Sequence, residues 1–338
     1  MLTPVRAFDW RDGERLIRFG RGVAADPVAA LGGPGYLLLT TPRALAALPG
    51  AAAAAAGVHE VPAGAVPELA RAALDWVRPQ PAVDARIVAL GGGRVIDTAK
   101  AVTSALGVRA LAIPTTLSGA ELTRVHRHAA GVDEDTPRVR CSVVICDPQL
   151  AASQPGEELA ASALNALGHA VEAPCTVAAN PVATLAAHEA ARLLVGSFAL
   201  AAPDRDALAL GALLAGYALG STGYGLHHVL AQTLVRSGLA GHSEANALLL
   251  PHTIPALARR RGAEIAALAD ALGEDPAGAA ERIHQRTGAA RLRGLERQAL
   301  EDCVEAAMAR PQLDNTPPRP DREELRAIYA AALGVSRA

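Results

Sequence analysis

The sequence predicts an α/β protein with two domains, a parallel-sheet domain first and an all-α helical domain after it. Residues 1–150 alternate short apolar strand patterns with helical patterns, which is typical of a parallel sheet with helices on its faces. Residues 151–338 show helical patterns only. A length of 338 residues suits two domains, and a hydrophobic content of 51% is enough for a large core.

Five apolar segments of the first domain are predicted to be strands. They are 16–19, 36–40, 87–90, 111–114 and 143–146. Helices are predicted between them, with Pro42 at the start of one and 66–77 forming another. The alanine run 51–56 is interpreted as a helix, and the polar segment 124–140 as irregular.

Helical patterns occupy the second domain. They cover 157–173, 181–200, 204–220, 263–272 and 322–333. Pro203, Pro251 and Pro255 are expected to separate helices, because proline lacks the backbone N–H that a helix interior uses. A helix that opens at 241–246 is therefore expected to end near Pro251.

The three consecutive glycines Gly91, Gly92 and Gly93 stand between a strand pattern at 87–90 and a helical pattern at 95–102. Glycine lets a backbone approach a diphosphate closely, and the N–H groups at a helix N-terminus favour an anion. The same glycines would also suit a plain strand-to-helix turn, and they do not form the G-x-G-x-x-G fingerprint of a dinucleotide site.

Polar residues lie at the carboxyl ends of two other predicted strands. Thr40 ends one strand and Thr41 follows it, and Thr115 and Thr116 follow another. Ligands of parallel sheets bind beyond the carboxyl ends of the strands. We therefore expect these threonines at the same edge of the sheet as the glycines.

Two predicted helices carry polar pairs at a spacing of four residues, which places both members on one helix face. The pairs are Asn165 with His169, and His228 with Gln232. His242 opens a third helix. A lone helical histidine is usually structural, but polar pairs among Ala and Leu need partners when buried. These side chains are expected to face one another or a ligand.

Composition excludes several classes of protein. The formal charge is −2 with 3% aromatic residues and no basic stripe, so nucleic-acid binding is not expected. Neither a signal peptide nor a membrane span is predicted. Cys141, Cys146, Cys175 and Cys303 lack metal-type spacing and are expected to be buried, reduced thiols of a cytoplasmic protein.

The chain resembles the iron-containing (group III) alcohol dehydrogenases. The segments that carry this resemblance are 91–100, 113–116, 164–172 and 245–252, in the family's order and spacing. Within the family it is most similar to the maleylacetate reductase branch, through 114–123, 164–165, 225–228 and 315–320.

This resemblance implies a Rossmann-like domain followed by a helical domain, a dehydroquinate synthase-like architecture with the active site between them. It implies NADH or NADPH as cofactor and a homodimer. The residues implied to bind the cofactor are Thr40, Thr41, Gly91, Gly92, Gly93, Arg94, Asp97, Thr115, Thr116 and Leu117. The family often has an acid for the ribose hydroxyls where this chain has Thr41, and Arg43 nearby makes a 2′-phosphate tolerable.

The metal site departs from the family pattern. Metal-dependent members use an aspartate and three histidines, and those places here hold Asn165, His169, Gln232 and His242. An amide oxygen supplies no charge to a divalent cation. A tightly bound metal is therefore not expected, although His169 and His242 would still suit one. Arg94, where the family usually has a small serine, would either add a phosphate contact or obstruct one.

Catalysis without metal would rely on hydrogen bonds to an enolate or alkoxide oxygen. The candidate catalytic residues are Asn165, His169, His228, Gln232 and His242. One histidine would deliver a proton, because the ordinary pKa of histidine is near neutral. Arg124, His126, Arg127 and His128 would either bind substrate carboxylates or form a solvated hairpin.

The leading hypothesis is an NAD(P)H-dependent reductase of a small keto or enone carboxylic acid, similar to maleylacetate reductase. One alternative is a non-redox member of the fold, such as a lyase, cyclase or isomerase. Another is a catalytically silent interaction protein, which the polar clusters argue against because unused buried polar groups cost stability.

Overall fold

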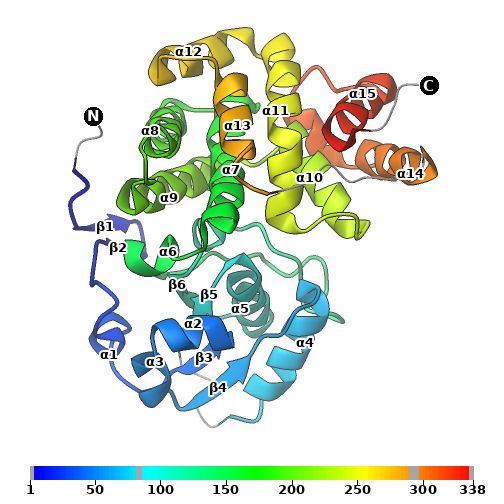
Figure 1. Cartoon of the computed structure of the whole chain (residues 1–338). Helices are drawn as coiled ribbons and strands as arrows, with labels where there is room; N and C mark the ends of the chain where they lie inside the picture. Colours follow the sequence, from blue (N-terminus) through cyan, green and yellow to red (C-terminus); the bar gives the residue numbers. More distant parts are fainter. Residues whose placement is uncertain (1–3, 81–85, 289–296, 335–338) are drawn as a thin grey trace. The chain divides into compact units, whose positions relative to one another are not determined.

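The computed structural model describes residues 4–80, 86–288 and 297–334. The chain forms two compact units. Unit 1 comprises Met1–Gln154 with Arg205–Leu213, and unit 2 comprises Pro155–Asp204 with Leu214–Ala338 (Figure 1). The sequence pattern does not indicate that the segment Arg205–Leu213 belongs to unit 1. A domain boundary near residue 150 stays a prediction.

Unit 1 contains a seven-stranded sheet. Its strands are β1 (Phe8–Asp12), β2 (Arg15–Phe19), β3 (Leu37–Thr40), β4 (Gly57–Glu60), β5 (Ile87–Gly91), β6 (Ala110–Pro114) and β7 (Val143–Cys146), in the order β1-β2-β7-β6-β5-β3-β4. Among the described strands, β1 and β2 pair antiparallel and every other pair is parallel. The predicted α/β class and the five predicted strands are confirmed. The sequence missed β1 and β4 because both are edge strands with half of their residues turned outward, so neither forms an apolar run.

The helices of unit 1 are α1 (Pro27–Ala30), α2 (Pro42–Ala47), α3 (Gly50–Ala53), α4 (Val66–Val77), α5 (Gly93–Leu106) and α6 (Pro148–Ala151). The predicted helix at 51–56 is wrong in its second half, because the chain leaves α3 after Ala53 to enter β4. One face of the sheet, with Leu38, Val88 and Ile113, packs in a cluster with residues of α1, α2, α3 and α6. In Figure 1, α5 lies against the strands.

Unit 2 is helical, with no strand among its described residues. Its helices are α7 (Gly156–Glu172), α8 (Pro181–Phe198), the second part of α9 (Arg205–Thr222), α10 (Leu226–Arg236), α11 (His242–Arg260), α12 (Gly262–Leu272), α13 (Pro276–His284), α14 (Arg297–Met308) and α15 (Arg322–Leu333). Three short 3₁₀ helices, η1 (Ala120–Leu122) in unit 1 and η2 (Ala173–Cys175) and η3 (Pro311–Asn315) in unit 2, complete the described elements.

Helix α11 corrects one prediction. Pro251 and Pro255 do not end it; both lie inside a helix that continues to Arg260. Proline removes a backbone hydrogen bond from a helix interior. Here α11 packs against α7, α10, α13 and α15, and this apolar contact along most of its length outweighs the local loss. The helical conformation of α11 at Pro251 and Pro255 is therefore stabilised by packing against these four helices rather than by helix propensity.

Two further expectations concern the whole chain. Among the described residues, no single helix is long and apolar enough to cross a membrane; the pair α9 and α10 passes that test together but is bent by 100°. All four cysteines are buried and free, as predicted, and burial raises the pKa of the Cys141 and Cys175 thiols to about 12.

Candidate active site

The glycine-rich turn of unit 1 joins β5 to α5. Gly91 is the last residue of β5, Gly92 is the N-cap of α5, and Gly93 is its first residue. No side chain in the described part of the chain caps this helix. The N–H groups of its first turn are therefore left for another acceptor, and the helix dipole favours an anion.

The loop after β6 explains why these positions hold glycine. A Cβ added to Gly92 would lie 2.8 Å from Thr116 Cγ2, and one added to Gly93 would lie 3.1 Å from the Cβ of Ser118. Both distances are shorter than side chains tolerate without a shift of the neighbour. The glycines therefore let this loop pack directly on the turn. This packing is a second reason for glycine at these positions, besides the close approach of a ligand.

The threonines predicted at this edge of the sheet lie there. Thr40 donates from Oγ1 to the Leu90 carbonyl at 2.9 Å, and the Thr115 N–H donates to the Gly91 carbonyl at 3.0 Å. Thr41 caps α2 through a 3.3 Å bond from the Ala44 N–H. Leu117 is buried on the same loop as Thr116. The structure thus brings together residues from β3, β5 and β6, and their binding of a cofactor stays a prediction.

Two other cofactor candidates lie on α5. Arg94 is exposed in its first turn. Asp97 forms an ion pair with Lys100 at 2.8 Å, and Lys100 is fully buried. Lys100 also donates to the carbonyls of Ala120, at 2.7 Å, and of Val125, at 2.9 Å. The sequence interpretation missed this lysine, which fixes the segment after β6 on α5.

The segment 124–128 is not a solvated hairpin, because two of its side chains are buried. His126 and His128 are buried, whereas Arg124 and Arg127 are exposed. His126 donates from Nδ1 to the Arg127 carbonyl at 3.1 Å and accepts at Nε2 from the Val139 N–H at 3.2 Å. Burial lowers the pKa of His126 to about 4, so it is neutral and structural.

In unit 2, α7 and α10 bring the predicted histidines together. The rings of His169, from α7, and His228, from α10, stack with centroids 4.7 Å apart. Both side chains are buried, as is Asn165, one turn before His169. Burial lowers the pKa of both histidines, that of His228 to about 3. Both histidines therefore stay neutral at physiological pH, and delivery of a proton by one of the candidate histidines stays a prediction.

Glu172, which the site prediction did not include, holds His228 in place. Its Oε2 accepts from His228 Nδ1 at 2.7 Å, and its Oε1 accepts from the His227 N–H at 2.7 Å. Burial raises the pKa of Glu172. Because Nδ1 of the neutral imidazole donates to the carboxylate, we assign the lone pair of His228 to Nε2.

His227 connects this pair to α11. Its Nδ1 lies 2.9 Å from Thr253 Oγ1 and its Nε2 lies 3.1 Å from Asn246 Oδ1. A Cβ added to Gly168 would lie 2.6 Å from His227 Nε2, so glycine is needed there. Asn246 donates to the carbonyl of His242, the exposed first residue of α11, at 2.8 Å.

Gln232 has a partner that the sequence did not indicate. Arg310, at the start of η3, donates from Nη2 to Gln232 Oε1 at 3.1 Å and to the Tyr224 hydroxyl at 3.0 Å. It also donates from Nε to Gln312 Oε1 at 3.2 Å. The 78 residues that separate Arg310 from Gln232 leave no periodic signal of this contact.

The side chains of His169, His227, His228, Gln232 and Arg310 form what we call the histidine cluster. Three buried nitrogen atoms of this cluster make no hydrogen bond with any described residue. They are His169 Nδ1, His228 Nε2 and Arg310 Nη1. Buried polar atoms in folded proteins are nearly always satisfied by protein, water or ligand. The cluster therefore offers hydrogen-bonding capacity to a polar molecule.

The donors do not fit a divalent metal ion. No group of three or more His, Cys, Asp or Glu side chains in the described ranges converges as metal ligands. Of the four places where the family has ligands, Gln232 directs its amide oxygen to the Arg310 guanidinium. A cation bound there would lie beside a permanent positive charge, with no carboxylate among the four side chains to offset it.

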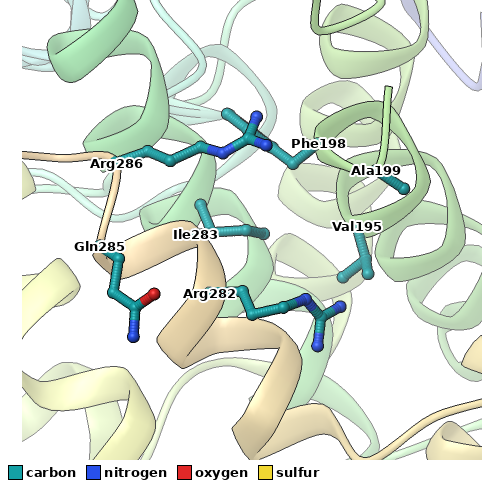
Figure 2. A pocket seen from close by; sticks show the side chains of 7 residues that line it. All are labelled: Val195, Phe198, Ala199, Arg282, Ile283, Gln285 and Arg286. Carbon is teal, nitrogen blue, oxygen red and sulfur yellow. The ribbon is translucent and has the colours of Figure 1, made fainter. Parts of the chain in front are cut away.

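A cavity of about 240 Å³ lies elsewhere in unit 2, between the end of α8 and α13 (Figure 2). It is lined by Val195, Phe198, Ala199, Arg282, Ile283, Gln285 and Arg286. The Arg286 guanidinium lies 5.7 Å from the centre of the Phe198 ring. No residue of the histidine cluster borders this cavity, so it is a separate feature.

Comparison with known proteins identifies the family. Residues 159–333 match the model of the C-terminal domain of the Fe-containing alcohol dehydrogenase family, and residues 52–123 match a second iron-containing alcohol dehydrogenase model. The chain belongs to the iron-containing alcohol dehydrogenase family, whose members are NAD(P)-dependent oxidoreductases.

Within the family, the chain is similar to maleylacetate reductases. It is 36% identical to maleylacetate reductase 2 of Cupriavidus pinatubonensis over 68% of this chain and 66% of that protein. It is 33% identical to a maleylacetate reductase of a Rhizobium species over 76% and 78% of the two chains. The crystal structure of maleylacetate reductase from Agrobacterium tumefaciens superposes with a TM-score of 0.81 at 30% identity, with 100% of each chain covered.

Proposed function

We propose that this chain is an NAD(P)H-dependent reductase of a small keto or enone carboxylic acid, with maleylacetate as the model substrate. The observation that carries the proposal is the cluster of three unpartnered nitrogens in unit 2, on His169, His228 and Arg310. The membership of the chain in the iron-containing alcohol dehydrogenase family supports a dinucleotide as the cofactor. The similarity to maleylacetate reductases adds an acidic substrate and disfavours the non-redox alternative.

The residues present fit a nicotinamide dinucleotide in unit 1. The uncapped first turn of α5 would hold the diphosphate, with Gly92 and Gly93 giving the backbone access. Thr40, Thr115 and Thr116 line the same edge. When bound, NAD(P)H supplies a hydride. Because Thr41 replaces an acid and Arg43 is exposed nearby, we propose that NADPH is accepted as well as NADH.

In unit 2 we assign the substrate-facing roles to His169, His228 and His242. Reduction of an enone acid adds hydride to the carbon β to the ketone, leaves an enolate, and adds a proton at the α carbon. Glu172 fixes the His228 ring, and the His169 and His228 nitrogens orient the substrate. His242 is the candidate proton donor, because it alone of the three is exposed and exchanges protons with water.

We further propose that the enzyme works without a tightly bound metal, because two of the four ligand places hold amides and Arg310 lies against one of them. Asn165 and Gln232 then act as hydrogen-bonding groups. A homodimer in the cytoplasm is part of the same proposal, and light scattering on the purified protein tests the dimer.

A substrate comparison tests the proposal. Purified protein is mixed with NADH or NADPH and with maleylacetate, a simple keto acid, or an uncharged aldehyde, and the nicotinamide absorbance is followed. We expect turnover of the enone or keto acid and at least about tenfold lower kcat/KM for the aldehyde, since it lacks a carboxylate. Absence of nicotinamide oxidation with every acid would show that the reductase assignment is wrong and would favour a non-redox reaction.

A further inference from the structure

We propose that Arg310 binds a carboxylate of the substrate, in the part of the site where other family members hold a metal ion. This inference rests on the proposed function and deepens it, because it names the group that selects an acidic substrate. It also moves the expected carboxylate partner from the segment 124–128 of unit 1 to unit 2.

The first argument is charge. Guanidinium groups stay protonated in proteins, and all three acceptors of the Arg310 guanidinium are neutral: the Tyr224 hydroxyl and the amide oxygens of Gln232 and Gln312. No carboxylate among the described residues pairs with it. Arg310 is partly buried and its Nη1 atom is fully buried, and taking an unpaired charge out of water is costly. An anionic ligand would supply the missing negative charge.

The second argument is the unused nitrogen. Nε and Nη2 are committed to protein acceptors, whereas Nη1 is buried and makes no hydrogen bond with any described residue. Nη1 carries two N–H groups, so it offers donors to one or both oxygens of a carboxylate. Charge-assisted bonds of this kind are about twice as strong as neutral ones.

The third argument is position. Arg310 Nη2 bonds to residues 224 and 232, which lie four positions before and after His228. Tyr224 also contacts the His228 ring, with ring centroids 6.3 Å apart. The guanidinium is therefore held beside the face of α10 that carries His228 Nε2. A substrate bound to Arg310 would lie next to the unpartnered histidine nitrogens.

Gln232 has a specific part in this arrangement. Its amide oxygen orients the guanidinium but does not neutralise it. A glutamate at this position would form an ion pair with Arg310 and neutralise the guanidinium charge in the free enzyme, before any substrate binds. Glutamine at this position thus keeps a positioned cation available, which makes the variant Gln232→Glu a direct test.

The experiment measures binding of maleate, a dianion without a ketone, by calorimetry in the absence of any nicotinamide. Arg310→Met and Gln232→Glu are each expected to weaken maleate binding by at least about 30-fold, as expected when a buried charge pair is lost. Gln232→Glu keeps the hydrogen bond to Arg310 and should fold even if Arg310→Met does not. The matched control is Arg286→Met, which removes a guanidinium beside the separate cavity of Figure 2 and should bind maleate as the wild type does.

Kinetics separate binding from a structural role. With an enone acid, Gln232→Glu should raise KM by a similar factor while the melting temperature is unchanged or higher, and kcat/KM for an uncharged enone should change less than about threefold.

The inference is overturned if the wild type does not bind maleate, if Gln232→Glu binds it normally, or if Arg286→Met loses binding instead. If maleate binds through Arg310 but no acid oxidises NAD(P)H, this inference stands and the proposed reductase function fails.

Discussion

The glycine-rich turn of unit 1 and the histidine cluster of unit 2 are built in opposite ways. The turn offers backbone N–H groups at the start of α5, from residues adjacent in sequence. The cluster offers side-chain nitrogens from α7, α10 and the start of η3. Glu172 orients His228, Gln232 orients Arg310, and the His169 ring stacks on His228. Backbone donors depend on local geometry, whereas side-chain donors depend on long-range partners. The two regions should therefore respond differently to substitution.

The largest expected effect concerns the four positions of unit 2 where metal-dependent members of the family have their metal ligands. The double change Asn165→Asp with Gln232→His restores one carboxylate and one imidazole, and we expect zinc affinity to rise by at least about 1,000-fold, since even outer-shell partners are worth 10–100-fold each. Isothermal titration with Zn²⁺ measures it. Adding Arg310→Met should raise the affinity further by removing a nearby positive charge. An unresponsive double variant would show that the four places do not converge.

Glu172→Gln tests the orienting role of the carboxylate. The amide cannot accept from both His227 and His228 as the carboxylate does, so the His228 tautomer is no longer fixed. We expect kcat/KM to fall by about 100-fold, in line with the loss of a partner that orients a histidine. NADH affinity, which depends on unit 1, should be unchanged. A comparable loss of NADH binding in Glu172→Gln would contradict the assignment of cofactor binding to the glycine-rich turn rather than to the histidine cluster.

Gly92→Ala tests the turn. The new Cβ would displace Thr116, and overpacking of about 1–3 kcal/mol corresponds to roughly 5–150-fold weaker NADH binding. Maleate binding should not change. Gly50→Ala is the matched control in the same unit, because its Cβ would meet Pro27 at an ordinary 3.7 Å. Normal NADH titration of Gly92→Ala would place the cofactor elsewhere.

The smallest effect is on stability. Burial raises the pKa of Glu121 to about 7 from an ordinary value of 4.5. The stability from this protonated group is fully present below about pH 4.5 and is lost as pH rises to about 7. Glu121→Gln should therefore be more stable than the wild type at pH 8, by about 1–3 kcal/mol, and equal to it at pH 4. Urea unfolding at both pH values measures this, with the exposed Glu134→Gln as control. An equal difference at both pH values would contradict the assignment.

Local sequence signals predicted much of the fold. Strand patterns such as 87–90 and 143–146, and the helices α4 and α15, were predicted because apolar spacing along one segment reports its burial. The edge strands β1 and β4 lack this spacing. The continuation of α11 through Pro251 and Pro255 was missed because it depends on four neighbouring helices.

The candidate site divides in the same way. The pair His169 and His228 was recognisable from polar residues at helical spacing and from the family resemblance. Glu172, Lys100 and Arg310 were missed, because a buried charged residue reveals its role only through partners distant in sequence. The tautomer of His228 follows from its hydrogen bond to Glu172, and the neutrality of His169 follows from burial; the sequence reports neither residue by residue.

The most direct test of the central claim, reduction of an enone acid without metal, is a rate measurement after exhaustive chelation. The protein is dialysed against a strong chelator, its metal content is measured by elemental analysis, and NAD(P)H oxidation with maleylacetate is followed. We predict substoichiometric metal before dialysis and an unchanged rate after it. A rate that collapses on chelation and returns with added Fe²⁺ or Zn²⁺ would contradict the account.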